Sequence, residues 1–483
     1  MIFNFDNSYL SLPAELFAEC KPTAVSRPQV VAFNTSLASS LGIQIDAENE
    51  AELVEIFSGN NLPKGAANIA QAYSGHQFGH FTRLGDGRAV LLGEQLTPTG
   101  ERFDLQFKGS GVTPYSRRGD GRATLSAMLR EYIISEAMHA LHIPTSRSLA
   151  VVATDEPVYR EQIQMGAVLT RVAASHIRVG TFEHVARFCS HETLAAFTNY
   201  VIKRHYPELT ASENPALALL EKVINQQIDL IVNWMRVGFI HGVMNTDNMT
   251  ISGETIDYGP CAFMNAYNPE TVFSSIDTGG RYAFGNQPQI ALWNLTRLAE
   301  SLVPLIDVDT NIAVQKAEKL LNTFQSIFEQ KYIEMLARKI GICKFETNDA
   351  LLINELLNWM YLNNADYTNS FVKLMYPDSI SDKIFEHESF LAWKNKWTVR
   401  LNKDEKGDFS ALEIMQQNNP VYIPRNQQVE KVLSDVTETG QLASLNTISM
   451  LLSNPYTTTN FDKKAMEAPA QAIEQVYKTY CGT

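Results

Sequence analysis

Alternating apolar and polar residues predict a β-hairpin in the first quarter of the chain. Residues 89–96 (AVLLGEQL) form an apolar run with β character, and residues 102–108 (RFDLQFK) alternate strictly between apolar and polar side chains. A period of two is typical of a strand, and the intervening sequence at 97–100 (TPTG) has turn chemistry. The pattern places Lys108 at the end of the polar face of the second strand.

Apolar residues at helical spacing dominate the chain after this hairpin. The spacing predicts a helix from about residue 123 to 142, a second helix that ends at Gly238 and a third that begins near Pro288. Between the second and third helices, the sequence predicts two short strands, at residues 249–252 and 255–256, joined at a glycine. Mostly helical segments fill the rest of the chain.

The order of these elements indicates an α+β, protein-kinase-like fold with two lobes, in which a nucleotide lies between the lobes. A chain of 483 residues is long enough for two or three packed units. We divide it into an N-terminal extension (1–60), an N-lobe with the nucleotide-binding hairpin and helix (61–185), a C-lobe with the catalytic loop and metal site (186–310), and a helical C-terminal region (311–483).

Composition narrows the classes of function. Asp and Glu outnumber Lys and Arg by 53 to 40, which gives a formal net charge of −13 and argues against a nucleic-acid-binding protein. We find no secretory or transit segment and no apolar run long enough to cross a membrane, so we expect a cytoplasmic protein without a membrane partner. The five cysteines lie far apart with no CxxC pair, which disfavours a disulfide framework or a zinc site.

Candidates for ATP chemistry occur around the predicted hairpin and helix. Such chemistry needs a glycine-rich turn at the phosphates, a cation on a strand, an acid that holds this cation, and oxygen ligands for a metal ion. Gly85-Asp86-Gly87-Arg88 precedes the first strand, Lys108 ends the second, and Glu131 lies in the helix. Each has an ordinary alternative when taken alone: a common turn, a solvated lysine and a surface glutamate.

Two arginines and two histidines add further candidates. Arg171 and Arg178 lie seven residues apart, and guanidinium groups bind phosphate oxygens in a fork that lysine cannot match. Two unrelated surface arginines are an equal alternative. His76 and His80 have i,i+4 spacing, but the neighbouring glycines argue against a ligating helix. We interpret these histidines as turn or packing residues rather than metal ligands.

The strongest motif lies between the second and third helices. Residues 241–248 read HGVMNTDN, and Asp-Tyr-Gly follows at 257–259, which matches the kinase order His-x-Asp-x-x-x-x-Asn and then Asp-Phe-Gly. Val243 stands where kinases have the catalytic aspartate, so the usual proton acceptor is missing, while Asp247 is an additional acid. Asn248 and the aspartate of the tripeptide remain as hard oxygen ligands that suit Mg²⁺. A buried polar loop is the alternative interpretation.

These motifs resemble the selenoprotein O (YdiU-like) family of pseudokinases. The resemblance spans most of the chain and is densest from residue 73 to 288. It rests on five long motifs: YSGHQFG at 73–79, LGDGRA at 84–89, LQFKGSG at 105–111, YSRRGDGR at 115–122 and HGVMNTDN at 241–248.

The resemblance implies a protein-kinase-like fold that binds ATP in a flipped orientation. The γ-phosphate is then buried and the α-phosphate faces the acceptor, so the product is AMP on a Ser, Thr or Tyr hydroxyl of a protein substrate. Members are also described as transferring UMP, favoured by Mn²⁺. The expected metal is therefore Mg²⁺ or Mn²⁺, with ATP as the substrate and UTP as an alternative donor.

The family's functional positions carry over to residues of four kinds. The residues that match nucleotide contacts are Gly85, Gly87, Arg88, Lys108, Asp120, Gly121, Arg171, Arg178 and Asp257. Asn248 and Asp257 match the metal ligands, Asp247 matches the proton acceptor, and Glu131 matches the partner of the strand lysine.

A cysteine close to the C-terminus is a further feature of the family. Cys481 lies near the end of this chain, and Cys261 lies just after the Asp-Tyr-Gly motif. The resemblance therefore raises the hypothesis of a regulatory disulfide between Cys261 and Cys481, although cytosolic thiols are usually reduced.

Two other functions remain open from the sequence. One is a conventional kinase for a small molecule or a protein, against which Val243 argues. The other is a non-enzymatic ATP-binding scaffold, against which the intact Lys108, Asn248 and Asp257 argue, because a pure scaffold does not need a complete metal site.

Overall fold

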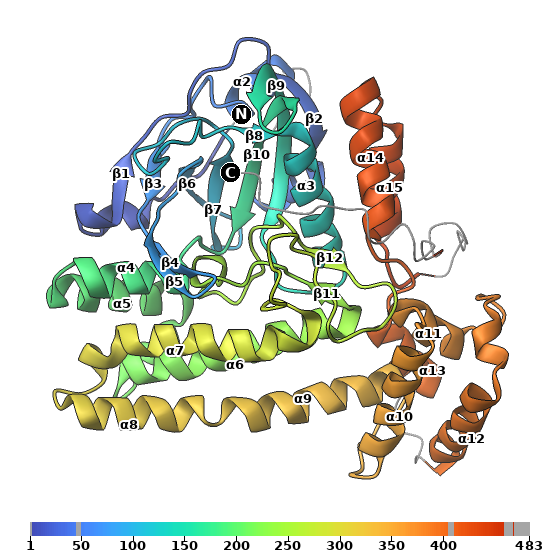
Figure 1. Cartoon of the computed structure of the whole chain (residues 1–483). Helices are drawn as coiled ribbons and strands as arrows, with labels where there is room; N and C mark the ends of the chain where they lie inside the picture. The colour runs from blue at the N-terminus through green and yellow to red at the C-terminus, as the bar shows by residue number, and fades with distance from the viewer. Residues whose placement is uncertain (1, 45–49, 404–409, 458–466, 468–483) are drawn as a thin grey trace.

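An eight-stranded antiparallel sheet forms the upper part of the molecule in Figure 1. The computed structural model describes residues 2–44, 50–403, 410–457 and 467. The strand order is β1-β3-β6-β7-β10-β9-β2, and β8 pairs with β10. The strands are β1 (Phe17–Glu19), β2 (Gln29–Phe33), β3 (Ile69–Gln71), β6 (Ala89–Leu96), β7 (Arg102–Lys108), β8 (Ala123–Thr124), β9 (Arg147–Tyr159) and β10 (Ile163–Ala173).

Both edges of this sheet come from the first residues of the chain. Strand β1 pairs with β3, and strand β2 pairs with β9. Residues 17–33 therefore complete the sheet whose centre is built from residues 89–108 and 147–173.

The predicted hairpin at residues 89–108 is confirmed as β6 and β7, with Ala89 opposite Lys108. The polar face of β7 is not solvated as an isolated strand would be, because Asp104, Gln106 and Lys108 are all buried. Each of them bonds to another buried polar group, which is the condition for keeping such side chains out of water.

The three predicted helices are confirmed as α3 (Leu125–Ala140), α6 (Pro215–Val237) and α7 (Gln287–Ile306). Helix α3 starts two residues later than predicted, because residues 123–124 pair with β10 as β8. Helix α6 ends where Gly238 adopts a left-handed conformation with φ of 74°, which glycine reaches without a steric penalty. Helix α3 lies against the sheet, while α6 and α7 form the layer below it (Figure 1).

The two short strands predicted at residues 249–256 are wrong. Isolated bridges replace them: Met249 pairs with Thr255, and Thr250 and Thr255 also pair with Arg178 and Thr145. The backbone of this segment bonds elsewhere, because Val179 N donates to Met249 O and Thr255 N donates to Pro144 O, each at 2.9 Å. The segment therefore joins the start of α4 to the end of α3 instead of forming its own hairpin.

Helices fill the remaining C-terminal part of the described chain, as predicted. The other helices are α1 (Thr35–Ser40), α2 (Glu50–Phe57), α4 (Val179–Phe188), α5 (His191–His205), α8 (Thr310–Leu321), α9 (Phe324–Lys339), α10 (Asp349–Leu362), α11 (Tyr367–Met375), α12 (Glu388–Lys403), α13 (Ala411–Asn418), α14 (Asn426–Thr439) and α15 (Ala443–Leu452). Two small two-stranded sheets are β4 (Ser74–Gln77) with β5 (His80–Arg83), which form a hairpin, and β11 (Phe239–Ile240) with β12 (Ala262–Phe263). Within the described ranges, every helix is too short or too polar to span a lipid bilayer.

The C-terminal helices α14 and α15 stand beside α3 (Figure 1). Arg130 of α3 is buried and contacts α14: its guanidinium donates to Glu430 Oε1 at 2.6 Å and to Asn426 Oδ1 at 2.7 Å. The same group donates to Cys261 O at 2.6 Å. Residues far apart in the sequence thus hold α3 against the segment that follows the Asp-Tyr-Gly motif.

The buried charge cluster of Arg204, Glu94 and Asp104 gives a prediction about the stability of the protein. Arg204 of α5 lies 2.9 Å from Glu94 Oε2 and 2.6 Å from Asp104 Oδ1, and both carboxylates are fully buried. Arg204→Met would leave the buried Asp104 without its guanidinium partner and Glu94 with the more distant Arg102 at 3.2 Å, which costs roughly 3–5 kcal/mol of unfolding free energy. Chemical denaturation at neutral pH measures the loss.

The matched control for this prediction is Arg27→Met. Arg27 pairs with Asp155 at 2.6 Å, but its side chain is 77% exposed, so its loss is expected to cost less than about 1 kcal/mol. Equal unfolding free energies for the two variants would contradict the account of the cluster.

Candidate active site

A cavity of about 240 Å³ opens between the sheet and the loop at residues 241–248. Every residue predicted to contact a nucleotide or a metal ion lines it, as does Asp247; Glu131 lies behind it. The cavity is also lined by residues to which the sequence assigned no individual role: Tyr73, Gln77, Tyr115, Arg117, Arg122, Arg160 and Asn245.

The strand lysine and the helix acid meet inside the protein. Lys108 Nζ lies 2.6 Å from Glu131 Oε2 and 2.9 Å from Asp257 Oδ1. Helix α3 positions Glu131, which is buried together with Lys108. The local sequence of each residue suggests a surface side chain, but both are buried. Their opposite charges compensate each other where water is excluded.

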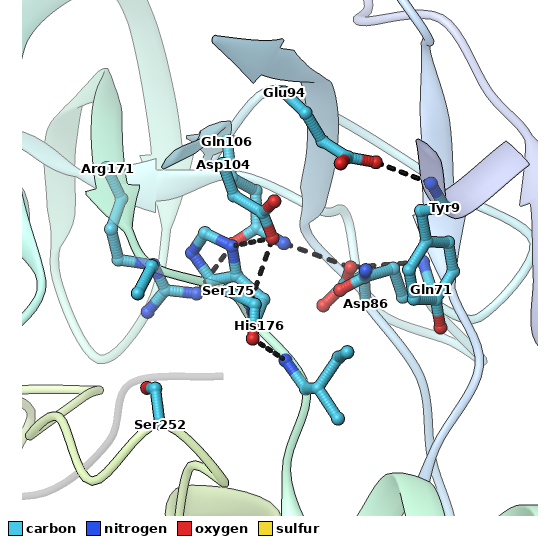
Figure 2. Close-up of polar contacts among 12 residues, drawn as sticks. Tyr9, Gln71, Asp86, Glu94, Asp104, Gln106, Arg171, Ser175, His176 and Ser252 are labelled. Carbon is cyan, nitrogen blue, oxygen red and sulfur yellow. Dashed lines mark hydrogen bonds and ion pairs between the residues drawn. The ribbon is translucent and has the colours of Figure 1, made fainter. Parts of the chain in front are cut away.

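The two predicted arginines enter the same cluster from β10 and from the residue that precedes α4. Arg171 lies 2.6 Å from Asp257 Oδ1 and donates to Gln106 Oε1 at 2.6 Å. Gln106 in turn donates to Asp86 Oδ2 at 3.0 Å, so it lies between the arginine and the aspartate in Figure 2. Arg178 is 3.7 Å from Asp86 Oδ1. Both arginines are therefore oriented by the aspartate of the glycine-rich turn.

Asp257 is the shared anion of this cluster. Burial alone would raise its pKa, but Lys108, Arg171 and Arg178 outweigh burial and hold the pKa of Asp257 well below its usual range. Its backbone has φ of 65°, a left-handed conformation that is strained for a non-glycine residue and recurs at functional sites. His241 supports it, since the imidazole contacts Ile256 O at 2.8 Å.

Asp247 lies in a different environment within the same cavity. It is buried, and this burial raises its pKa to about 7 despite the opposing charge of Arg178. Among the described residues, its Oδ1 has no hydrogen-bond partner. Val243 also lines the cavity and has no polar group. Asp247 is therefore the carboxylate in this loop that can accept a proton from a hydroxyl group.

The oxygen atoms at the cavity wall fit a hard divalent cation. Asn248 donates to Asp257 Oδ2 at 3.1 Å, and the buried Oδ1 of Asn248 has no partner within the described ranges. In these ranges, no three His, Cys, Asp or Glu side chains are placed so that they could hold a metal ion by themselves. An amide oxygen, a carboxylate and substrate phosphates form the donor set typical of Mg²⁺ or Mn²⁺ at a nucleotide.

The glycines of the predicted phosphate-contacting segments permit close backbone approach. Gly85 has φ of 136°, and a Cβ on it would lie 2.7 Å from Tyr115 Cδ1 and closer still to Cγ of the same ring. Gly121 has φ of 65°, and a Cβ there would lie 2.6 Å from Val112 N. Asp120 lies at the rim, where it pairs with Arg160 at 2.7 Å.

The hairpin β4–β5 lies directly against the catalytic loop, which the sequence did not predict. His76 N donates to Thr246 Oγ1 at 2.7 Å, and Phe78 N donates to Asn245 Oδ1 at 3.0 Å. The His76 imidazole forms a short bond with Glu183 of α4. The YSGHQFG motif thus positions the loop through main-chain donors, a role that side-chain types alone do not reveal.

Gly75 in this hairpin gives a second prediction. A Cβ at Gly75 would lie 2.8 Å from Asp247 Cγ, so Gly75→Ala must displace that carboxylate. We expect kcat to fall by roughly a hundredfold, since small misplacements of reacting groups have such effects, while nucleotide affinity measured by calorimetry stays close to wild type.

Gly279→Ala is the control for Gly75→Ala. A Cβ at Gly279 meets nothing within 4 Å, and this variant should keep full activity. An unchanged kcat for Gly75→Ala would contradict the placement of Asp247 in the reaction.

The structure describes only one of the two cysteines in the proposed Cys261–Cys481 disulfide. Cys261 is buried next to the Asp-Tyr-Gly motif, and Cys481 lies outside the described residues.

Comparison with known proteins identifies the family of this chain. The family described as "Protein adenylyltransferase SelO" matches residues 1–453. The chain is similar to the protein nucleotidyltransferase YdiU of Bacillus cytotoxicus, with 52% identity over 481 residues that cover 100% of this chain and 98% of the relative. The protein of the same name from Pelagibacter ubique is 51% identical over 481 residues, covering 100% and 99%.

A solved structure with a weaker likeness is ROP2 from Toxoplasma gondii, described as a virulence factor with a protein-kinase fold and no enzymatic activity. It covers 77% of this chain and 96% of its own, with 10% identity and a TM-score of 0.26. A TM-score this low supports no argument about the site.

Proposed function

The chain belongs to the SelO family of protein adenylyltransferases, and we propose that it transfers AMP from ATP to hydroxyl groups of protein substrates. The chain is an enzyme of the nucleotidyltransferase class, and its sheet followed by a helical layer is the element order expected of a protein-kinase-like fold. The finer proposal is that ATP binds with its γ-phosphate innermost, that the acceptor is Ser, Thr or Tyr, and that UTP is an alternative donor.

One observation carries the proposal. Three cationic side chains lie deep in the cavity, whereas Asp247, the carboxylate that can accept a proton, lies in the loop at residues 241–248, where Val243 replaces the usual catalytic aspartate of kinases. Lys108, Arg171 and Arg178 gather around Asp257. They would neutralise a diphosphate placed at that end, which becomes the leaving group. The α-phosphate would then lie toward Asp247, which lines the same cavity.

The reaction follows from these positions. The acceptor oxygen attacks the α-phosphorus, the bond from this phosphorus to the bridging oxygen of the β-phosphate breaks, and diphosphate leaves. Asp247 accepts the hydroxyl proton. Asn248 and Asp257 would hold Mg²⁺ or Mn²⁺, which when bound neutralises phosphate charge. Glu131 keeps Lys108 in position.

Product analysis tests the proposal. The purified enzyme is incubated with a protein acceptor and either ATP or UTP, with Mg²⁺ or Mn²⁺ in separate reactions. Intact-mass spectrometry is expected to show the addition of a nucleoside monophosphate, and fragmentation should place it on Ser, Thr or Tyr. Addition of a phosphate alone would indicate a conventional kinase, and ATP binding without any product would indicate a scaffold.

A further inference from the structure

Aromatic rings form a continuous row on the outside of the hairpin β4–β5. Phe188 at the end of α4 packs near Phe81 with ring centroids 6.2 Å apart. The ring of His76 follows at 5.2 Å from Phe81, and Trp293 of α7 lies 5.2 Å from His76 on its other side. The row therefore crosses three elements, β4–β5, α4 and α7.

Four arginines stack on these rings. The guanidinium of Arg83 lies 5.2 Å from the Phe188 centroid, and that of Arg187 lies 4.6 Å from the Phe81 centroid. Two more guanidinium groups flank the ring of Trp293, with centroid distances of 4.9 Å for Arg281 and 5.0 Å for Arg297. We call this set the arginine–aromatic surface; its members are Phe81, Arg83, Arg187, Phe188, Arg281, Trp293 and Arg297.

This surface carries positive charge on a protein whose net charge is −13. Arg83 and Arg187 are exposed, and Phe188 is 45% exposed. Within the described part of the chain, Arg83, Arg187 and Arg281 form no ion pair with a carboxylate, whereas Arg297 pairs with Glu300 at 2.8 Å. The exposed Arg83 and Arg187 are therefore available to an anionic partner, whereas Arg281 is half-buried.

The surface borders the catalytic loop. Tyr282, next to Arg281, donates to Asn245 Oδ1 at 2.5 Å, and Asn245 lines the cavity. His76, in the middle of the aromatic row, binds Thr246 through its backbone. The arginine–aromatic surface therefore adjoins the loop that carries Asp247.

We propose that the arginine–aromatic surface binds an acidic stretch of the acceptor protein next to the modified residue. This inference rests on the proposed function and deepens it by naming the class of acceptor. Arginine and aromatic side chains are enriched at interface hot spots, and stacking on a ring leaves the guanidinium edge available for bidentate contact with a carboxylate. An acidic partner complements the unpaired cations.

Two peptides and one double variant test the proposal. The acidic peptide has Asp and Glu on both sides of the acceptor hydroxyl, and the neutral peptide has Asn and Gln at the same positions. For the wild-type enzyme we expect a KM roughly tenfold lower for the acidic peptide, and this preference should weaken as salt increases. In the double variant Arg83→Glu/Arg187→Glu, the preference should vanish while kcat on the neutral peptide remains unchanged.

Arg338→Glu is the matched control, since Arg338 is exposed on α9 outside this surface; it should keep the preference. Equal KM values for both peptides with the wild-type enzyme would overturn the docking proposal while leaving the transferase proposal intact. If neither peptide is modified, the transferase proposal fails for these acceptors.

Peptide binding measured by fluorescence anisotropy then decides the docking proposal independently of activity. Tighter binding of the acidic peptide, lost in the double variant, supports it, and equal binding of both peptides overturns it. Self-association of the wild type in sedimentation, abolished in the double variant, would also overturn it, because it would assign the surface to a second copy of this chain.

Discussion

Asp257→Asn is expected to lower the rate of nucleotidyl transfer by roughly a thousandfold or more. Asp257 accepts contacts from Lys108 at 2.9 Å and from Arg171 at 2.6 Å. Asparagine would leave both cations without their shared anion and would remove one of the two proposed metal ligands. Loss of several kcal/mol of charge stabilisation corresponds to at least about three orders of magnitude in rate.

Steady-state kinetics with ATP and a protein acceptor measure this effect. Circular dichroism and a thermal melt establish that the variant is folded, which matters because the aspartate is buried. Asp229→Asn is the control: Asp229 lies on α6 in an exposed pair with Lys331, and its loss should leave the rate unchanged. A variant at Asp257 that is folded and retains more than a tenth of wild-type activity would contradict the assigned role.

Asp247→Asn is expected to lower kcat by roughly a hundredfold to ten-thousandfold, the range for loss of a general base. The substitution keeps the size of the side chain but removes the proton acceptor. Its Oδ1 has no partner among the described residues, so the fold should tolerate the change. Nucleotide affinity should remain close to wild type, because Lys108, Arg171 and Arg178 are untouched.

Calorimetric titration with a non-hydrolysable ATP analogue separates these two effects. Weak binding together with a low rate would show that Asp247 holds the nucleotide instead of accepting the proton. A rate equal to wild type would show that another group accepts the proton. Val243→Asp adds a second comparison: restoring an acid at the usual kinase position should not rescue Asp247→Asn if the acceptor enters beside Asp247.

The periodic spacing of apolar residues predicted those helices and strands that bury one face along their whole length. The hairpin β6–β7 and the helices α3, α6 and α7 were all predicted from the spacing of apolar residues. The pair of strands predicted at residues 249–256 failed because the backbone of this segment bonds to Ile177, Val179 and Pro144. Such contacts connect parts of the chain that are distant in sequence, so local propensity cannot reveal them.

Some site residues could be predicted and others could not, because their roles also depend on contacts between distant parts of the chain. Lys108 and Glu131 look like surface residues when each is considered with its neighbours, and only their mutual contact explains their burial. Their pairing was predicted from the resemblance to a known family. The roles of Gly75, His76 and Phe78 were missed because they act through backbone atoms and close packing. Gln106, which bridges Arg171 and Asp86 in Figure 2, was seen only as a strand residue.

The central claim is that the α-phosphate, rather than the γ-phosphate, is transferred. The most direct test incubates the enzyme and a protein acceptor with ATP labelled at the α-phosphate in one reaction and at the γ-phosphate in another. Our account predicts label on protein from the α-labelled ATP only, with loss of this label in Asp257→Asn. Label on protein from the γ-labelled ATP would contradict it.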